Sequence, residues 1–305
     1  MANSTGGLFH TMLTAATEAA EHPSFRNAFL DRIYWDYKPV VAIPNQGLTV
    51  TIPTVSEGDV SDIGGGPLTP TDTAHGTASI SLDKHFSSSF VIRNWDEIRT
   101  PADLKKKYIS PRFEALKRKM NRSIAQLVTV ANFPNYTLVN GVTDGVFARS
   151  EIGTAWSSLT NAGVPTDDAD NMSLITNVAA YAGMASSTAF TSEAGVGLPA
   201  AEAGIQRAQL LPQFGARVIY DQHIAVFNAG KEPGILMHKY AIAGVTANPP
   251  SGGNGVDETT VMLGDVPVQV QMQYSLRDQG WLVNIHCFWG VAVVRADYAA
   301  LLETD

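Results

Sequence analysis

The chain has 305 residues, of which 45% are hydrophobic and only 16% are charged, and its formal net charge is −8. The single cysteine excludes an intrachain disulfide framework and a zinc site built on cysteines, and the acidic balance disfavours nucleic-acid binding over the surface as a whole. A charged fraction below the usual quarter favours an oligomer that hides much of its surface, because interface centres are depleted in charge.

Residues 1–46 are predicted to form an arm in front of the main body. The first residues, MANSTGGLFHTML, lack the basic region and apolar run of a secretion signal. No stretch approaches the ~18 consecutive apolar residues of a membrane-spanning helix. We therefore expect no membrane segment and a protein that is made and kept in a cytoplasm. The aromatic-rich segment FRNAFLDRIYWDYKP is expected to pack on its own domain or on a neighbour.

Two alternating strands flank a long segment that has almost no large apolar side chains. Residues 48–52 and 77–83 each alternate apolar with small polar residues, which predicts two strands with one buried face. Between them lies GDVSDIGGGPLTPTDTAHGT, at 58–77, which we expect at the tip of a long antiparallel hairpin. Because a two-stranded hairpin is marginal in water, this one needs another surface to rest on.

A long amphipathic helix is predicted from about residue 101 to residue 131. Thr100 is a good N-cap and Pro101 suits the first helical position. Apolar residues then recur at three-, four- and five-residue steps. Pro111 lies inside this pattern, so a kink is expected there.

Basic residues are concentrated in this helix, although the chain is acidic overall. Two interpretations stay open: the solvated face of an amphipathic helix, or a positive stripe that faces a polyanion, since phosphate contacts need only clustered Lys and Arg. The eight residues are Lys105, Lys106, Lys107, Arg112, Lys117, Arg118, Lys119 and Arg122.

The middle of the chain mixes short helices and strands. Helices are predicted at 154–162 and over VAAYAGMAS, and strands at 172–177, 217–224 and 234–245. This irregular order favours an α+β fold over a doubly wound sheet.

The C-terminal part carries the strongest β-pattern. Residues 266–274 and 281–289 alternate on either side of the turn SLRDQG, which predicts a long hairpin with one aromatic-rich buried face. Gly290 is predicted to mark a bulge. Cys287 is expected to be a buried, inert thiol, and His286, on the polar side of the strand, a surface or hydrogen-bonded histidine.

The motifs of common enzymes are missing from the sequence. It contains no GxGxxG, GxxxxGK[ST], GxSxG or HExxH pattern, and its seven histidines lack metal-ligand spacing. We therefore expect no catalytic residue, no cofactor and no metal. The aspartates of TDDAD, at 166–170, lack the pattern of a calcium loop and are interpreted as a solvated turn. An α+β hydrolase that uses this cluster with a histidine is the distant alternative.

Taken in order, these segments resemble the tailed-bacteriophage major capsid proteins of the Hong Kong 97-type fold, and most closely their coat-protein branch. GLTVTIPTVSEGDVSDI followed by TASISLDKHFSSSFVIRNWDEIRTPADL resembles the family's extended loop and its return to the long spine helix. NAGVPTDDADNMSLITNVAAYAGM resembles the opening of the axial domain, and GWLVNIHCFWGVAVVRADYAALL resembles the closing strand.

The resemblance implies an α+β capsid fold with a defined division of the chain. Residues 1–46 would form the N-terminal arm and 47–92 the extended loop. A peripheral domain with the spine helix would comprise 93–140 and, with the closing β-hairpin, 246–305. The axial domain would comprise 141–245.

The resemblance also implies a structural, non-enzymatic role. The protein would assemble with itself, as hexamers and pentamers, into an icosahedral shell around double-stranded DNA. Assembly would take place in the host bacterial cytoplasm, with a separate scaffolding protein, a portal and possible decoration proteins, and without a membrane. The spine helix would face the interior, where its eight basic residues would meet DNA. An encapsulin-like shell that loads a cargo enzyme is the main alternative.

Contacts between subunits are expected from the extended loop. An autocatalytic lysine–asparagine crosslink is not identifiable from the sequence, although a lysine lies near the loop. The expected contact residues are Glu57, Asp59, Asp62, Gly64, Gly65, Gly66 and Lys84.

Overall fold

The computed structural model describes most of the main body of the chain. The described residues are 28–35, 49–55, 75–93, 103–138, 147–187, 190, 210, 212–224, 231–249, 253 and 255–304. Within them, the side chains of 53–55, 75, 103–107 and 136–138 are left out of the description. The predicted helix cap at Thr100 and Pro101 lies outside the described residues, as does the tip of the hairpin. No helix of the described part is long and apolar enough to cross a membrane.

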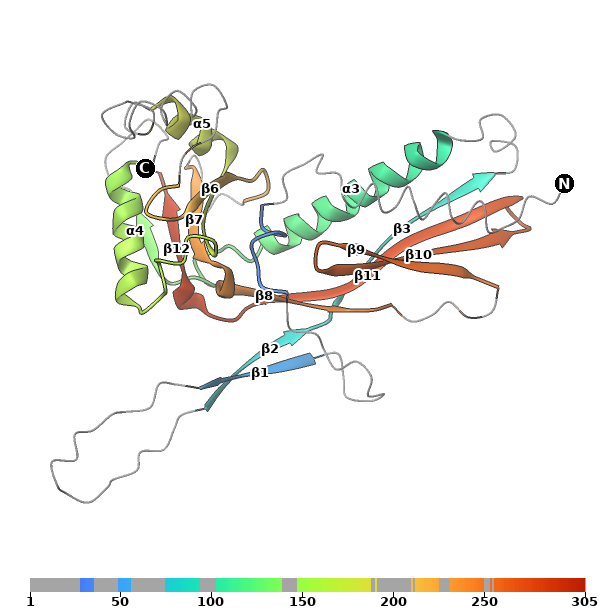
Figure 1. Ribbon diagram of the computed structural model, residues 1–305, viewed down its shortest axis with the longest axis horizontal. Coiled ribbons are helices and arrows are strands. Elements are labelled where there is room, and N and C mark those ends of the chain that lie inside the picture. The colour runs from blue at the N-terminus through green and yellow to red at the C-terminus, as the bar shows by residue number, and fades with distance from the viewer. Residues whose placement is uncertain are drawn as a thin grey trace, which may run out of the picture.

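The larger part of the body is an antiparallel sheet with a long helix along one face (Figure 1). The strands run in the order β3-β11-β10-β9, and β8 pairs with the far half of β11. The helix α3 (Asp103–Ala125) lies along the sheet beside β3. The strands are β3 (Lys84–Arg93), β8 (Ile242–Ala247), β9 (Asp257–Leu263), β10 (Val266–Ser275) and β11 (Gly280–Val293).

The second sheet is mixed and forms a separate lobe with two short helices. Its order is β4-β12-β7-β5-β6, with parallel pairs at each edge and antiparallel pairs in the centre. Apolar residues of α4 (Arg149–Asn161) and α5 (Val178–Ser186) share one buried cluster with these strands. The strands are β4 (Tyr136–Leu138), β5 (Met172–Thr176), β6 (Arg217–Tyr220), β7 (Pro233–His238) and β12 (Ala299–Glu303). The predicted α+β class is confirmed.

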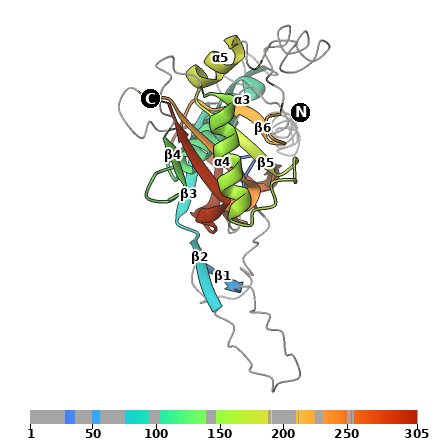
Figure 2. The ribbon, with the colours of Figure 1, turned by 90° about the vertical axis from the view of Figure 1, so that its left-hand side faces the viewer.

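The predicted N-terminal hairpin is confirmed and projects from the body. Strand β1 (Thr49–Val55) pairs antiparallel with β2 (His75–Ser81), and Val50 lies opposite Ile80. Figure 2 shows the hairpin extending away from both sheets. The alternation of apolar and small polar residues therefore identified both strands and their pairing.

The helix α3 is continuous through Pro111 but ends at Ala125, earlier than predicted. Beyond this point the amides of Leu127 and Val128 bond to carbonyls three residues back instead of four. The side-chain amide of Asn132 donates to the Leu127 carbonyl at 2.8 Å. These local bonds replace the helical ladder, which the apolar spacing alone does not reveal.

The sheets divide the chain differently from the predicted domains. The segment 234–245 contains two strands, separated by a 3₁₀-helix at Lys239–Ala241 that carries the chain from the second sheet into the first. A second 3₁₀-helix at Ala296–Tyr298 carries it back. The predicted boundary at 245/246 thus falls inside β8. Strands β4 and β12, assigned to the peripheral domain, pair with each other in the second sheet, where β12 also pairs with β7.

The predicted bulge at Gly290 is wrong, and the glycine has another function. Strand β11 pairs continuously, with Gly290 opposite Val245. A Cβ atom at Gly290 would overlap the backbone carbonyl of Ser81, at the end of β2. The residue therefore lacks a side chain so that the foot of the hairpin can approach the sheet.

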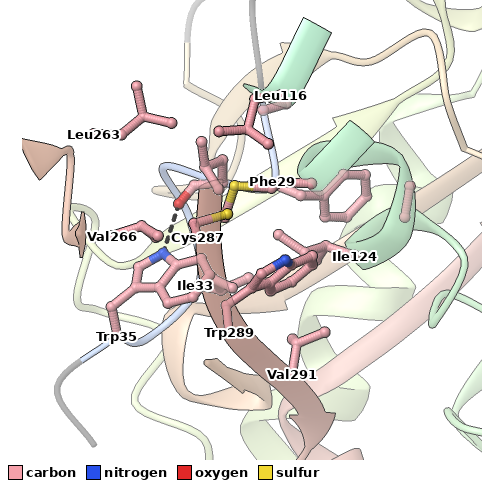
Figure 3. Packing of buried hydrophobic residues seen from close by; sticks show 14 of the residues in the cluster. Phe29, Ile33, Trp35, Leu116, Ile124, Leu263, Val266, Cys287, Trp289 and Val291 are labelled. Carbon is pink, nitrogen blue, oxygen red and sulfur yellow. Dashed lines mark hydrogen bonds between the residues drawn. The ribbon is translucent and has the colours of Figure 1, made fainter. Parts of the chain in front are cut away.

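The main core lies between α3, the first sheet and residues 28–35. Figure 3 shows Phe29, Ile33 and Trp35 packed against Trp289 and Ile124, with the Trp35 indole N–H donating to the Leu30 carbonyl at 2.9 Å. This confirms that part of the aromatic-rich segment packs on its own subunit. Cys287 is buried here too, as predicted, and burial raises the pKa of its thiol to about 12.

Candidate functional site

The foot of the hairpin is fixed to the first sheet by a small apolar cluster. Ile52, Ile80 and Leu82 are buried against Ala243 and Val245 of β8. This cluster holds the base of both strands, and the described parts of β1 and β2 extend from it beyond the body (Figure 1). The six predicted contact residues from Glu57 to Gly66 lie outside the described residues.

Lys84 lies at this foot, where β3 begins. Its ammonium group is 3.0 Å from a carboxylate oxygen of Asp83 and 5.5 Å from the ring centroid of Trp289. Both contacts are within its own subunit. The side chain is only 23% exposed, so the structure places it against the body rather than along the free part of the hairpin.

Four basic side chains form an exposed surface on α3, which we call the α3 basic face. They are Arg112, Arg118, Lys119 and Arg122. Arg112 donates to the Ser88 hydroxyl at 3.3 Å and lies over the Phe90 ring, and Lys119 lies over the Phe86 ring at 5.9 Å. The stems of these two residues cover apolar rings while their charges stay near solvent. The side chains of Lys105, Lys106 and Lys107 lie outside the description.

Lys117 does not belong to this face, contrary to the sequence expectation. Its side chain is buried, on the side of α3 that packs into the core. Burial lowers the pKa of its ammonium group, while the charges of Glu114 and Asp31 act in the opposite direction. The sequence count of eight basic residues therefore includes one that serves the interior of the subunit.

The aspartate cluster does meet a histidine, but no nucleophile contacts the pair among the residues that the structure describes. A carboxylate oxygen of Asp168 lies 3.9 Å from Nε2 of His238, a residue that is buried. The Nδ1 atom of His238 accepts the Tyr240 amide. Ser173 lies on the neighbouring strand β5, yet its buried hydroxyl has no hydrogen-bond partner within the described part. Nucleophilic catalysis requires a base in contact with the nucleophile, so this geometry gives the hydrolase alternative no support.

No group of three or more potential ligands for a metal ion occurs among the residues that the structure describes. Another titratable cluster is a histidine pair on the sheet face opposite α3. The Nε2 atom of His85 lies 3.2 Å from Nδ1 of His286, and His85 stacks on Phe288. His286 is buried and hydrogen-bonded. Of the two predicted alternatives, a surface histidine or a hydrogen-bonded one, the hydrogen-bonded histidine is therefore confirmed.

The two buried histidines should make the subunit less stable in acid. Burial lowers the pKa of both His286 and His238, so between the folded pKa and the ordinary value near 6.5 the unfolded chain binds more protons. Their stabilising contribution is present above pH ~6.5 and is lost as the pH falls below it. The free energy of unfolding is measured in urea at pH 7.5 and at pH 5.5. Its decrease between the two pH values should be smaller for His286→Gln than for wild type. A decrease equal to that of wild type in both His286→Gln and His238→Gln would contradict this.

Three solved structures share the architecture described above. A structure from Mycobacterium phage Che8 matches with a TM-score of 0.65 and 18% identity over 91% of each chain. The capsid structure of cyanophage P-SCSP1u matches with a TM-score of 0.61 and 16% identity, over 85% of this chain and 84% of that one. The holo-SrpI encapsulin complex from Synechococcus elongatus PCC 7942 gives 0.50 and 10%, over 92% and 87%. No protein-family model and no curated protein sequence matches the chain.

The likeness extends over most of each chain, 91% for the Che8 structure and 85% of this chain for P-SCSP1u. The chain therefore has the Hong Kong 97-type capsid fold, as the resemblance in its sequence predicted.

Proposed function

We propose that this protein is a major capsid protein of a tailed bacteriophage, which assembles with itself into an icosahedral shell around double-stranded DNA. The observation that carries the proposal is the fold, shared over 85% of the chain with the P-SCSP1u capsid. The projecting hairpin adds support, because the contacts of its described part with the body lie at its foot. A shell gives the rest of the hairpin a surface on a neighbouring subunit.

In this proposal the protein is structural and non-enzymatic, and its location is the virion capsid. Hexamers and pentamers would form in the host bacterial cytoplasm, with a separate scaffolding protein, a portal and possible decoration proteins as partners. The first sheet with α3 would serve as the peripheral domain and the second sheet as the axial domain. The hairpin contacts would come from the six residues between Glu57 and Gly66, with Lys84 at the base.

Assembly is tested most simply by sedimentation of bacterial lysates that contain the protein. The proposal predicts that most of the protein sediments as closed particles, either alone or when expressed with the genes that neighbour its own. A protein that stays monomeric under both conditions would contradict it.

An encapsulin-like shell is the second candidate, favoured by the match to the SrpI complex at a TM-score of 0.50. The two candidates differ in what the shell contains, since a capsid encloses DNA and a compartment encloses a cargo protein. The ultraviolet spectrum and protein composition of nuclease-treated particles distinguish them. Protected DNA supports the capsid, and a second protein in its place supports the compartment.

The α3 basic face is proposed to contact the packaged DNA. Replacing Arg118, Lys119 and Arg122 by Gln should leave shell assembly intact and weaken DNA retention. The retention should also depend less on the salt concentration, because fewer counterions are released when the DNA binds. DNA content after heating is measured at several salt concentrations.

A matched control removes the same number of charges away from α3. Arg93, Arg149 and Arg277 are exposed residues outside this helix, and their replacement by Gln should leave DNA retention as in wild type. Equal DNA content and equal salt dependence in wild type and in the α3 variant would show that the basic face is only solvated.

A further inference from the structure

Residues 28–35, which we call the strap, lie where α3 and the two sheets meet. Tyr34 forms a bridge to β8: its amide donates to the Ile242 carbonyl, and its carbonyl accepts the Gly244 amide. The Trp35 ring packs so closely on Gly244 that a Cβ atom there would overlap it. Arg32 reaches the other lobe and donates to the Asp170 carbonyl, before β5, at 3.0 Å. The strap therefore contacts both parts of the subunit.

One side chain of α3 holds the start of the strap. The Oδ1 atom of Asn121 accepts the amides of Phe29 and Leu30, at 3.1 and 3.3 Å. Asn121 is fully buried. The two amides precede the bridge to β8, and this one oxygen satisfies both of them in the interior.

The same side chain reaches the second sheet with its other end. The Nδ2 atom of Asn121 donates to Oδ2 of Asp221, which directly follows β6, at 2.6 Å. Asp221 is buried, and its Oδ1 atom accepts the His223 amide at 2.7 Å. The amide of Asp221 donates to the Thr176 carbonyl at the end of β5. Asn121 thus links the strap, the spine helix and the second sheet through one buried network.

We propose that Asn121 and Asp221 form a latch that holds the strap at the junction of the two sheets and so fixes the angle between them in the assembling subunit. Asn121 is a positioning residue in this view. The inference rests on the proposed function, because the angle between the sheets matters through the curvature of the shell. Opening the latch is expected to free the strap and to broaden the range of shell diameters.

The geometry requires an acceptor and a donor on the same side chain. An aspartate at position 121 would place its second oxygen against the Asp221 carboxylate, and two carboxylates in contact repel each other unless they share a proton. A leucine would deprive two buried amides and the Oδ2 atom of Asp221 of the partner that Asn121 supplies. The amide of asparagine meets both demands at every pH.

Charged groups on each neighbouring element bear on the test. The strap carries Asp31 and Arg32, and α3 carries Glu114 and Lys117. The remaining ones are Arg217 on β6, Asp265 between β9 and β10, and His223, whose ring nitrogen lies 3.3 Å from Asp221. All are present in wild type, so the pH response of wild type is the reference for each variant.

The latch is tested by exchanging its two partners in Asn121→Asp, Asp221→Asn and the double variant. At pH 7.5 each single variant should exchange the Phe29 and Leu30 amides at least about tenfold faster than wild type. The double variant should restore protection, because the new side-chain amide at position 221 would donate to the new carboxylate at position 121 and its oxygen would still accept the His223 amide. At pH 5, a shared proton should restore protection in Asn121→Asp alone, measured against wild type at the same pH.

Particle diameters measured by electron microscopy give the second readout. At neutral pH the single variants should form shells of mixed size or aberrant particles, and the double variant shells of wild-type size. Unchanged exchange of the two amides, or a single wild-type diameter in both single variants, would overturn the latch. Failure of wild type itself to form shells would instead refute the proposed function and leave the exchange result to stand on its own.

Discussion

Replacing residues 56–74 by a two-residue Asn-Gly turn should yield a folded subunit that no longer forms closed shells. The paired residues of β1 and β2 end with Val55 opposite His75, so a tight turn closes the hairpin at that point. The buried foot at Ile52 and Ile80 is untouched, and the melting temperature of the unassembled subunit should stay close to that of wild type. Assembly should be lost because the proposed contacts on neighbouring subunits are removed.

A segment of equal length made of Gly and Ser is the matched control for this variant. It keeps the reach of the hairpin but removes the side chains from Glu57 to Gly66, and it should assemble poorly. Sedimentation of all three proteins measures the outcome. Closed shells at wild-type yield from the shortened hairpin would show that the segment makes no essential contact.

Trp289→Ala should cause the largest loss of stability of any single substitution in the main core, about 3–5 kcal/mol. The residue is fully buried on β11 and meets the rings of Trp35 and Phe86. It also lies beneath the Lys84 ammonium group. Removing it opens a cavity between the strap, α3 and the sheet, among the residues that surround it in Figure 3. Urea unfolding of the unassembled subunit measures the change.

Trp289→Phe is the control that separates packing from polarity. It keeps an aromatic ring and removes an indole N–H that has no hydrogen-bond partner within the described part of the chain. The loss should be clearly smaller than for alanine, because the cavity is smaller and no buried polar group is left unpaired. Equal losses for Phe and Ala would contradict the packing argument.

Much of the fold is predictable from the sequence, since its strands alternate cleanly and its long helix carries a regular apolar stripe. The two hairpins, the helix α5 and the strand β5 are found where the sequence places them. In the hairpins the pattern reports on a buried face, whereas all five residues of β5 are buried.

Other features depend on contacts between distant segments, which a local pattern does not contain. The segment 234–245 appears as one strand because both β7 and β8 are buried, and the short polar stretch at 238–240 that marks the crossing does not by itself reveal a change of sheet. Gly290 shows the same effect: its reason is the approach of Ser81, a residue more than two hundred positions away.

The presence of a basic helix was predictable from the sequence, but which of its basic residues are exposed was not. The charge count identified a basic helix, and the structure separates the exposed Arg118 and Arg122 from the buried Lys117. Asn121 lies between them and carried no signal, because a single polar residue in an amphipathic helix is ordinary. The one indication in the sequence was that position 121 falls on the face of the helix that carries the apolar residues.

The most direct test of the proposed function is a cryo-electron microscopy reconstruction of the particles formed in bacteria. The proposal predicts a closed icosahedral shell in which residues 56–74 of each subunit lie on a neighbouring subunit and α3 faces the enclosed DNA. A chain that forms only monomers or open aggregates would contradict the proposal, as would a shell whose hairpins fold back on their own subunits.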